Sequence, residues 1–200
     1  RLEEHGGPPD PSLLSRPEEH PELRLYDAAV GTVDAATALA HAKAGEAAAR
    51  EADARITNSE GATFTRAAGS KALVTSGGFA AASRGTYASL SVHPVADDAD
   101  GKKRSGYYWT ARRHLAELLP DADVGREAAR RTLAKLGARK VETQQCAVVF
   151  DPDVGRSILG LLAGCINGGA IWRRSSYLVD KLGERAASEL VTVTDDPLID

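Results

Sequence analysis

The segment from Arg55 to Arg113 constrains the fold more than any other part of this chain, because β-prone residues and glycines alternate through it. This pattern predicts an antiparallel β-meander. The edges of such strands can pair with an extended peptide or with another subunit, and the sequence leaves both open. The predicted strands are 55–58, 62–67, 72–76, 79–84, 86–95 and 105–113. The predicted turns are Glu60-Gly61, Gly69-Ser70, Gly77-Gly78 and Arg84-Gly85.

A helix is predicted on each side of the meander. Residues 33–53 are rich in Ala, the best helix former, and Thr32 is the expected cap. Residues 123–136 form the second helix, which Asp123 caps and Gly137 ends. The first helix is expected to turn a narrow apolar stripe towards the sheet, made of Val33, Ala36, Ala40, Ala44 and Ala47. The second is expected to bury Val124, Ala128, Leu133 and Leu136.

The last part of the chain predicts the start of a further domain. A buried strand is expected at 146–150, and Asp151-Pro152 then opens a helix that continues through 157–163. A short helix at 177–182 and a strand at 191–194 follow. The predicted fold class is therefore α+β. The Pro-rich residues 1–31 predict a linker, and the change of pattern at 143–145 predicts a domain boundary.

The composition favours a cytoplasmic protein. No window contains eighteen consecutive apolar residues, and no basic segment leads into an apolar one, so neither a membrane span nor a signal peptide is expected. Cys146 and Cys165 suit a reducing compartment. The net charge of −3 argues against direct nucleic-acid binding. The chain has no Met and begins at Arg1, so we expect a piece of a longer protein.

The residues do not predict a conventional zinc site. No two of the five His share a helix turn, and each is expected to be a surface or structural residue; they are His5, His20, His41, His93 and His114. Cys165 follows Gly164 and could be an activated thiol, but a small buried apolar residue is the favoured interpretation. The nearby glycines match neither a Walker loop nor a dinucleotide-binding fingerprint.

Two charged clusters have a structural and a functional interpretation. The cations near the end of the second helix complement the helix dipole or bind a phosphate or acidic partner; they are Arg130, Arg131, Lys135, Arg139 and Lys140. The acidic segment 97–101 predicts a solvated turn, because it lacks the distal Glu of a calcium-binding EF-hand loop.

Several blocks resemble the TldD/PmbA family, in one order from about Asp27 to the end of the chain. The resemblance is strongest to the PmbA branch, also called TldE. It implies that residues 1–31 are the tail of a preceding domain, 32–143 a middle domain and 144–200 the start of a C-terminal domain. The blocks are EADARITNSEG at 51–61, VGREAARRTLAKLGARK at 124–140, VVFDP at 148–152, LGLLAGCINGGA at 159–170 and RSSYLVDKLG at 174–183.

The resemblance implies a cytoplasmic complex that cleaves unfolded peptides, in which a TldD-like partner carries the zinc. In TldD the corresponding helix carries His-Glu-x-x-x-His, and the matching positions here are Gly160, Leu161 and Cys165. Gly and Leu can neither ligate zinc nor accept a proton. We therefore expect no catalytic residue, metal ligand or cofactor in this chain, and either a hetero-oligomer with a TldD-like subunit or a homodimer.

The residues that follow this degenerate motif are the candidates for peptide binding. Asn167, Gly168 and Gly169 are predicted to contact a peptide backbone, because Gly permits close approach. A helix C-cap at the same place is an equally good interpretation. Two other functions stay open: a peptidase active in its own right with ligands outside this segment, and a non-enzymatic modulator of DNA gyrase.

Overall fold

The computed structural model describes residues 22–75, 78–99, 101–194 and 196. The chain divides into two compact units, the first of which runs to Arg139 while the second begins at Lys140. The first unit combines helices with a four-stranded antiparallel sheet, so the predicted α+β class is confirmed. Its elements are α1 (Ala28–Thr32), α2 (Ala35–Glu51), β1 (Ile56–Val74), β2 (Ala80–Asp97), β3 (Lys103–Ser105), β4 (Tyr108–Arg112), the 3-10 helix η3 (Leu115–Glu117) and α3 (Asp121–Leu133).

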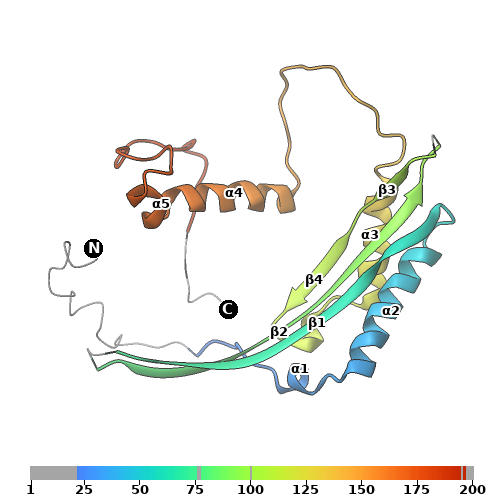
Figure 1. Ribbon diagram of the computed structural model, residues 1–200, viewed down its shortest axis with the longest axis horizontal. Helices are drawn as coiled ribbons and strands as arrows, with labels where there is room; N and C mark the ends of the chain where they lie inside the picture. Colours follow the sequence, from blue (N-terminus) through green and yellow to red (C-terminus); the bar gives the residue numbers. More distant parts are fainter. Residues whose placement is uncertain (1–21, 76–77, 100, 195, 197–200) are drawn as a thin grey trace. The chain divides into compact units, whose positions relative to one another are not determined.

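Strands β1 and β2 form one long hairpin, and β2 also pairs with β3 and β4. The end of this hairpin projects beyond α2 and α3 (Figure 1). The chain reverses between Thr75 and Phe79, whose backbone N and O lie 2.8 Å apart, and Gly78 there has a φ of +87°. The predicted turn at Gly77-Gly78 thus coincides with this reversal, although residue 77 lies outside the described ranges.

The other three predicted turns are wrong, because the strands continue through them. Gly69 pairs directly with Gly85, so the antiparallel pairing is unbroken at both positions. Gly61 has a φ of +113° and lies where the register of β1 and β2 shifts. A glycine at a bulge accommodates such a backbone without ending the strand. Fewer and longer strands therefore replace the predicted short ones.

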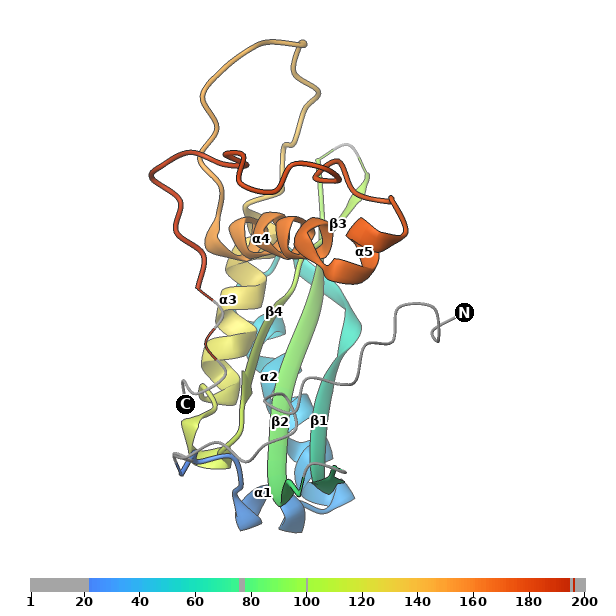
Figure 2. The ribbon, with the colours of Figure 1, turned by 90° about the vertical axis from the view of Figure 1, so that its left-hand side faces the viewer.

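The core lies between one face of the sheet and the helices α2 and α3. Figure 2 shows α2 behind strands β1 and β2. The buried cluster draws apolar residues from both helices and from the sheet, namely Ala49, Ile56, Leu90, Val92, Ala96, Val124, Ala128 and Ala129. The two helices touch at glycine: a Cβ on Gly125 would lie 2.2 Å from the backbone O of Gly45. Close packing of backbones therefore joins the helices.

Helix α2 buries a different face from the one predicted. Its buried residues are Ala42, Gly45 and Ala49, whereas four of the predicted stripe residues, Ala36, Ala40, Ala44 and Ala47, are exposed. Gly45 explains the choice, because a Cβ there would lie 2.9 Å from Cγ2 of Val92. The helix packs through its smallest residue. Its cap is Asp34 rather than Thr32: the Asp34 side chain accepts from Thr37 N at 2.7 Å.

Helix α3 follows the prediction closely. Val124 and Ala128 are buried, Leu133 and Leu136 are half-buried, and Gly137 after the helix has a φ of +69°. The helix begins earlier than predicted, so Asp123 lies in its first turn together with Asp121 and does not cap it. Carboxylates there complement the helix dipole.

The end of the predicted linker is ordered by Asp27. Residues 28–32 form α1 instead of an irregular segment, and Asp27 Oδ1 accepts from Ala29 N at 2.8 Å. Asp27 Oδ2 accepts from Leu115 N at 2.8 Å, and the Asp27 backbone N donates to Thr86 Oγ1 at 2.8 Å. These bonds to its carboxylate lower the pKa of Asp27. The linker predicted before residue 22 lies outside the described residues.

The second unit contains α4 (Pro152–Ile166) and α5 (Gly168–Trp172). Helix α4 confirms the predicted start, since the Asp151 side chain accepts from Asp153 N at 3.0 Å and Pro152 is the first helical residue. The strands predicted at 146–150 and 191–194 are wrong. Neither segment pairs with another strand among residues 140–194, and Val149 is 97% exposed. A strand requires a neighbour for its backbone groups.

Turns replace the short helix predicted at 177–182. Arg174 and Asp180 adopt positive φ values of 54° and 63° and form an exposed ion pair at 3.0 Å. None of the helices in the described ranges is long and apolar enough to cross a membrane.

Candidate functional site

The degenerate motif lies on α4, where the structure does not bring its positions together. Gly160 and Cys165 are five residues apart, which places them about 140° apart around the axis of a regular α-helix. A Cβ on Gly160 would meet nothing within 4 Å, and Leu161 is 71% exposed. Cys165 is half-buried rather than buried, and its backbone O accepts from Ser176 Oγ at 2.7 Å.

Asn167 connects the two helices of the second unit. Its backbone N donates to Ala163 O at 3.1 Å at the end of α4, and its side-chain Oδ1 accepts from Gly169 N at 2.9 Å at the start of α5. Asn167 is therefore the C-cap of one helix and the N-cap of the next. Gly168 has open space around it. The contact of Asn167, Gly168 and Gly169 with a peptide stays a prediction.

The described histidines all lie in the first unit and have structural contacts, as predicted. His41 Nδ1 lies 2.8 Å from Asp121 Oδ2, and its ring stacks on Phe64. His93 stacks on Tyr107, and His114 Nε2 lies 2.8 Å from Arg24 O. His5 and His20 are outside the described residues. Within those residues, no three His, Cys, Asp or Glu side chains are grouped as a metal site would require.

The cations of α3 are held mainly by contacts within the first unit. Arg130 makes two bonds of 2.7 Å to the Glu127 carboxylate, and Arg131 Nε lies 2.9 Å from the same group. Arg131 also lies over the Tyr108 ring. Arg130 is the main cause that lowers the pKa of Glu127 to about 2, and Arg131 adds to it against desolvation. These contacts favour the structural interpretation for Arg130 and Arg131, the two members of the cluster that lie on α3.

The acidic segment at 97–101 is also neutralised internally. Asp98 accepts from Arg104 Nε at 2.7 Å and from Gly137 N at 3.1 Å, while Asp97 pairs with Lys103. The hydrogen bond from Arg104 is the largest cause that lowers the pKa of Asp98. These carboxylates therefore have cationic partners. Asp97 is exposed, as the predicted solvated turn requires, but the Asp98 side chain is only 6% exposed and bonds to Arg104 and Gly137 instead of facing solvent.

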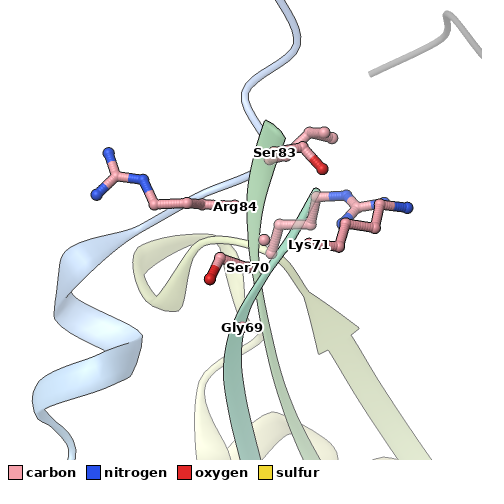
Figure 3. Close-up of a pocket in the computed structure, with 8 residues that line it drawn as sticks. Gly69, Ser70, Lys71, Ser83 and Arg84 are labelled. Atoms are coloured by element: carbon pink, nitrogen blue, oxygen red, sulfur yellow. The ribbon is translucent and has the colours of Figure 1, made fainter. Parts of the chain in front are cut away.

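A hollow of about 370 Å³, which the sequence did not predict, lies on the projecting part of the hairpin. Figure 3 shows Lys71 and Ser83 on one side of the two strands and Ser70 and Arg84 on the other. The register explains this arrangement, since Lys71 pairs with Ser83 and side chains alternate between faces. The residues that line the hollow are Leu25, Gly69, Ser70, Lys71, Ser83, Arg84, Gly85 and Arg113.

The floor of this hollow is a pair of glycines. Gly69 lies directly opposite Gly85, and both share the face of Lys71 and Ser83. A Cβ on Gly69 would meet nothing within 4 Å. A Cβ on Gly85 would lie 3.6 Å from Leu25 O and 3.9 Å from Arg113 Nη1. The missing side chains therefore leave an open space beside the Arg113 guanidinium.

The hollow is electropositive. The segment from Gly61 to Ala96 contains Arg66, Lys71 and Arg84 but no Asp or Glu, although the whole chain has a net charge of −3. Arg84 lies over the Tyr26 ring at 4.4 Å. This acid-free run is a sequence signal that could have pointed to the hollow.

A second hollow of about 480 Å³ lies beside the first and differs in charge. Its residues include Arg24 and Glu117, which form an ion pair at 3.1 Å. Three guanidinium groups line the second hollow, those of Arg24, Arg112 and Arg113, and the Glu117 carboxylate pairs with the first of them. Arg113 lines both hollows. The first hollow has no carboxylate among its lining residues.

Family comparison defines the class of protein. Residues 29–136 match the PmbA/TldA metallopeptidase central domain, and residues 143–200 match the PmbA/TldA metallopeptidase C-terminal domain. The class is thus a metallopeptidase family with a central α+β domain. More particularly, the chain belongs to the TldD/PmbA family, as its sequence blocks predict.

Curated relatives are named for the same family. The chain is 36% identical over 177 residues to the metalloprotease PmbA of Escherichia coli O157:H7, covering 88% of this chain and 39% of that protein. It is 33% identical over 177 residues to a metalloprotease PmbA homolog of Haemophilus influenzae, with the same coverage of 88% and 39%. The chain therefore spans about two fifths of the length of these relatives.

A solved structure has the same fold. A candidate modulator of DNA gyrase from Bacteroides thetaiotaomicron superposes with a TM-score of 0.79 at 28% identity, covering 90% of this chain and 40% of that one. A second, from Thermotoga maritima, gives a TM-score of 0.69 at 20% identity over 84% of this chain and 38% of that one, and shows the fold alone.

Proposed function

We propose that this chain belongs to a non-catalytic subunit, of the PmbA or TldE kind, in a cytoplasmic metallopeptidase complex. The subunit pairs with a zinc-bearing TldD-like subunit and helps to hold an unfolded peptide in an extended conformation. The observation that carries this proposal is the identity of the α4 residues at the motif positions. Gly160 has no side chain and Leu161 has an aliphatic one, so neither can bind zinc or take a proton from water.

The free edge of β1 supports the peptide-holding role. Within the described part of the sheet, β1 pairs with β2 alone. Thr86 pairs with Ala68 across the hairpin, yet its N–H donates to Leu25 O at 2.9 Å on the side away from β1. In an antiparallel pair of this kind both residues direct their backbone groups outwards. Ala68 therefore presents its N–H and C=O at the free edge, where an extended peptide can pair.

Reconstitution with a partner tests the proposed role. The full-length protein and a TldD-like subunit of the same organism would be purified separately and mixed, with cleavage of an unfolded peptide and bound zinc as readouts. We expect cleavage only when the TldD-like subunit is present, zinc on that subunit, and faster cleavage in the mixture. The Gly160→Ala/Leu161→Ala variant should support cleavage as well as the wild type.

Two results would overturn the proposal. Stoichiometric zinc and peptide cleavage by the full-length protein without a partner would indicate a peptidase active in its own right. Binding to DNA gyrase, with no effect of this protein on peptide turnover, would indicate the modulator function named for its structural relative.

A further inference from the structure

We propose that the glycine-floored hollow on the hairpin binds the carboxylate of an acidic side chain in an extended peptide. The inference rests on the proposed peptide-holding function and adds a preference for Asp or Glu to it. The hollow lies wholly within the first unit, between residues of β1, β2, the segment before α1 and the residue after β4.

The glycine pair provides the access that a peptide needs. Gly69 and Gly85 are directly opposite each other, so no side chain stands over either strand at that point. Phe64 of β1 and its partner Leu90 on β2 face the core between the sheet and the helices. Side chains alternate along a strand, and Gly69 is five residues after Phe64, so Gly69 lies on the opposite face of the sheet. A side chain from a peptide paired with the edge of β1 can therefore reach across the glycines without displacing the core.

The groups around the floor suit a carboxylate. Lys71 provides an ammonium, Arg113 a guanidinium and Ser83 a hydroxyl, and each of these can donate a hydrogen bond to a carboxylate oxygen. Neither Lys71 nor Arg113 forms an ion pair within the described residues. A bound carboxylate would supply the missing counter-charge.

The surroundings favour a peptide over a nucleic acid. Lys71 and Arg113, the two cations beside the glycines, match a single carboxylate, while Arg84 lies on the other side of the strands from Lys71 and over the Tyr26 ring. A nucleic acid requires a stripe of cations along its phosphates. The net charge of −3 opposes a polyanion. The walls of the hollow are strands, one of which has an unpaired edge, and strand pairing is a general mode of peptide recognition.

Two peptides that differ only in a carboxylate or an amide at one side chain test the proposal. One fluorescent unfolded peptide carries a central Glu and the other a central Gln, and both are titrated with the whole chain while anisotropy is recorded. We expect the Glu peptide to bind about tenfold more tightly, since hydrogen bonds to charged groups are stronger than neutral ones. The Lys71→Gln/Arg113→Gln variant should bind both peptides equally, at the affinity of the Gln peptide.

A matched variant controls for net charge. The Arg66→Gln/Arg112→Gln variant removes the same number of positive charges from the opposite face of the sheet. Both arginines pair with Ala88, which is buried on the core face, and paired residues lie on the same face. The wild-type preference for Glu should persist in this control.

Equal binding of the Glu and Gln peptides to the wild type would overturn the carboxylate site and leave the peptide-holding role intact. Loss of the preference in both double variants would also overturn the site, since the effect would then follow net charge. No binding of either peptide would overturn both proposals.

Discussion

His41 on α2 and Asp121 on α3 connect the two core helices through a short polar contact. His41 Nδ1 lies 2.8 Å from Asp121 Oδ2 and 3.0 Å from Oδ1. A carboxylate accepts hydrogen bonds and does not donate them, so the imidazole is the donor. The His41 ring also stacks on Phe64 of β1, with centroids 4.8 Å apart. The His41 imidazole of α2 thus contacts both α3 and the sheet, near the point where Gly45 of α2 meets Gly125 of α3.

Removal of this contact should destabilise the first unit modestly. We expect Asp121→Ala to lower the free energy of unfolding by about 1 kcal/mol, because the two side chains are only 31% and 26% exposed and their hydrogen bond is partly shielded from water. Urea unfolding followed by circular dichroism measures the change. Asp123→Ala is the matched control: it lies in the same first turn but pairs with exposed Arg126. If the two variants lose equal stability, the helix dipole rather than His41 explains the effect.

The close crossing of α2 and α3 should not tolerate a methyl group. Gly125→Ala would place a Cβ 2.2 Å from Gly45 O and 3.0 Å from Ala48 Cβ, so the helices would have to move apart. We expect a loss of about 2–3 kcal/mol in unfolding free energy. Gly31→Ala in α1 is the control, because a Cβ there meets nothing within 4 Å. A wild-type stability for Gly125→Ala would show that the crossing is looser than the structure gives.

Part of the loss of folding stability at acid pH should come from Glu127. Its pKa falls from 4.5 to about 2 on folding, mainly through Arg130. A lowered pKa stabilises the fold fully above the unfolded value, and the contribution is lost as pH falls from about 4.5 to about 2. Glu127→Gln should therefore be less stable than the wild type at pH 6, with the difference disappearing towards pH 2, as measured by thermal unfolding at each pH. A constant difference between pH 6 and pH 2 would contradict this assignment, and Glu51→Gln, at the end of α2, controls for the loss of one charge.

The sequence predicted the helices better than the strands for a physical reason. Ala and capping residues act locally, so α2 and α3 are found close to the predicted positions. The buried face of α2 is set by the long-range contact of Gly45 with Val92, which no local pattern contains. In β1 and β2, Gly61, Gly69 and Gly85 resemble turn residues but are tolerated within paired strands.

The hollow was missed because its cations are far apart in the sequence. Lys71 lies on β1 and Arg113 directly follows β4, and only the fold places both beside the same glycines. The spacing of the glycines does contain the register: Gly69 and Gly85 each lie eight residues from Gly77. A single hairpin centred on the Gly77-Gly78 turn therefore predicts that Gly69 faces Gly85, whereas a meander with a turn at each glycine does not.

Two neighbouring proline variants can show whether a peptide binds at the free edge of β1, because one removes an N–H from the free edge and the other removes an N–H that bonds to β2. Ala68 directs its N–H outwards, so Ala68→Pro removes no hydrogen bond of the hairpin and should leave the fold intact. The adjacent Ala67 pairs with Tyr87, and its N–H faces β2, so Ala67→Pro removes a ladder bond and should cost about 3 kcal/mol. Unfolding in urea compares the two stabilities, and anisotropy with an unfolded peptide compares binding. We expect Ala68→Pro to weaken peptide binding about tenfold in a folded protein, since the pyrrolidine ring both blocks the edge and removes a donor. Unchanged peptide binding by folded Ala68→Pro would show that the peptide pairs elsewhere.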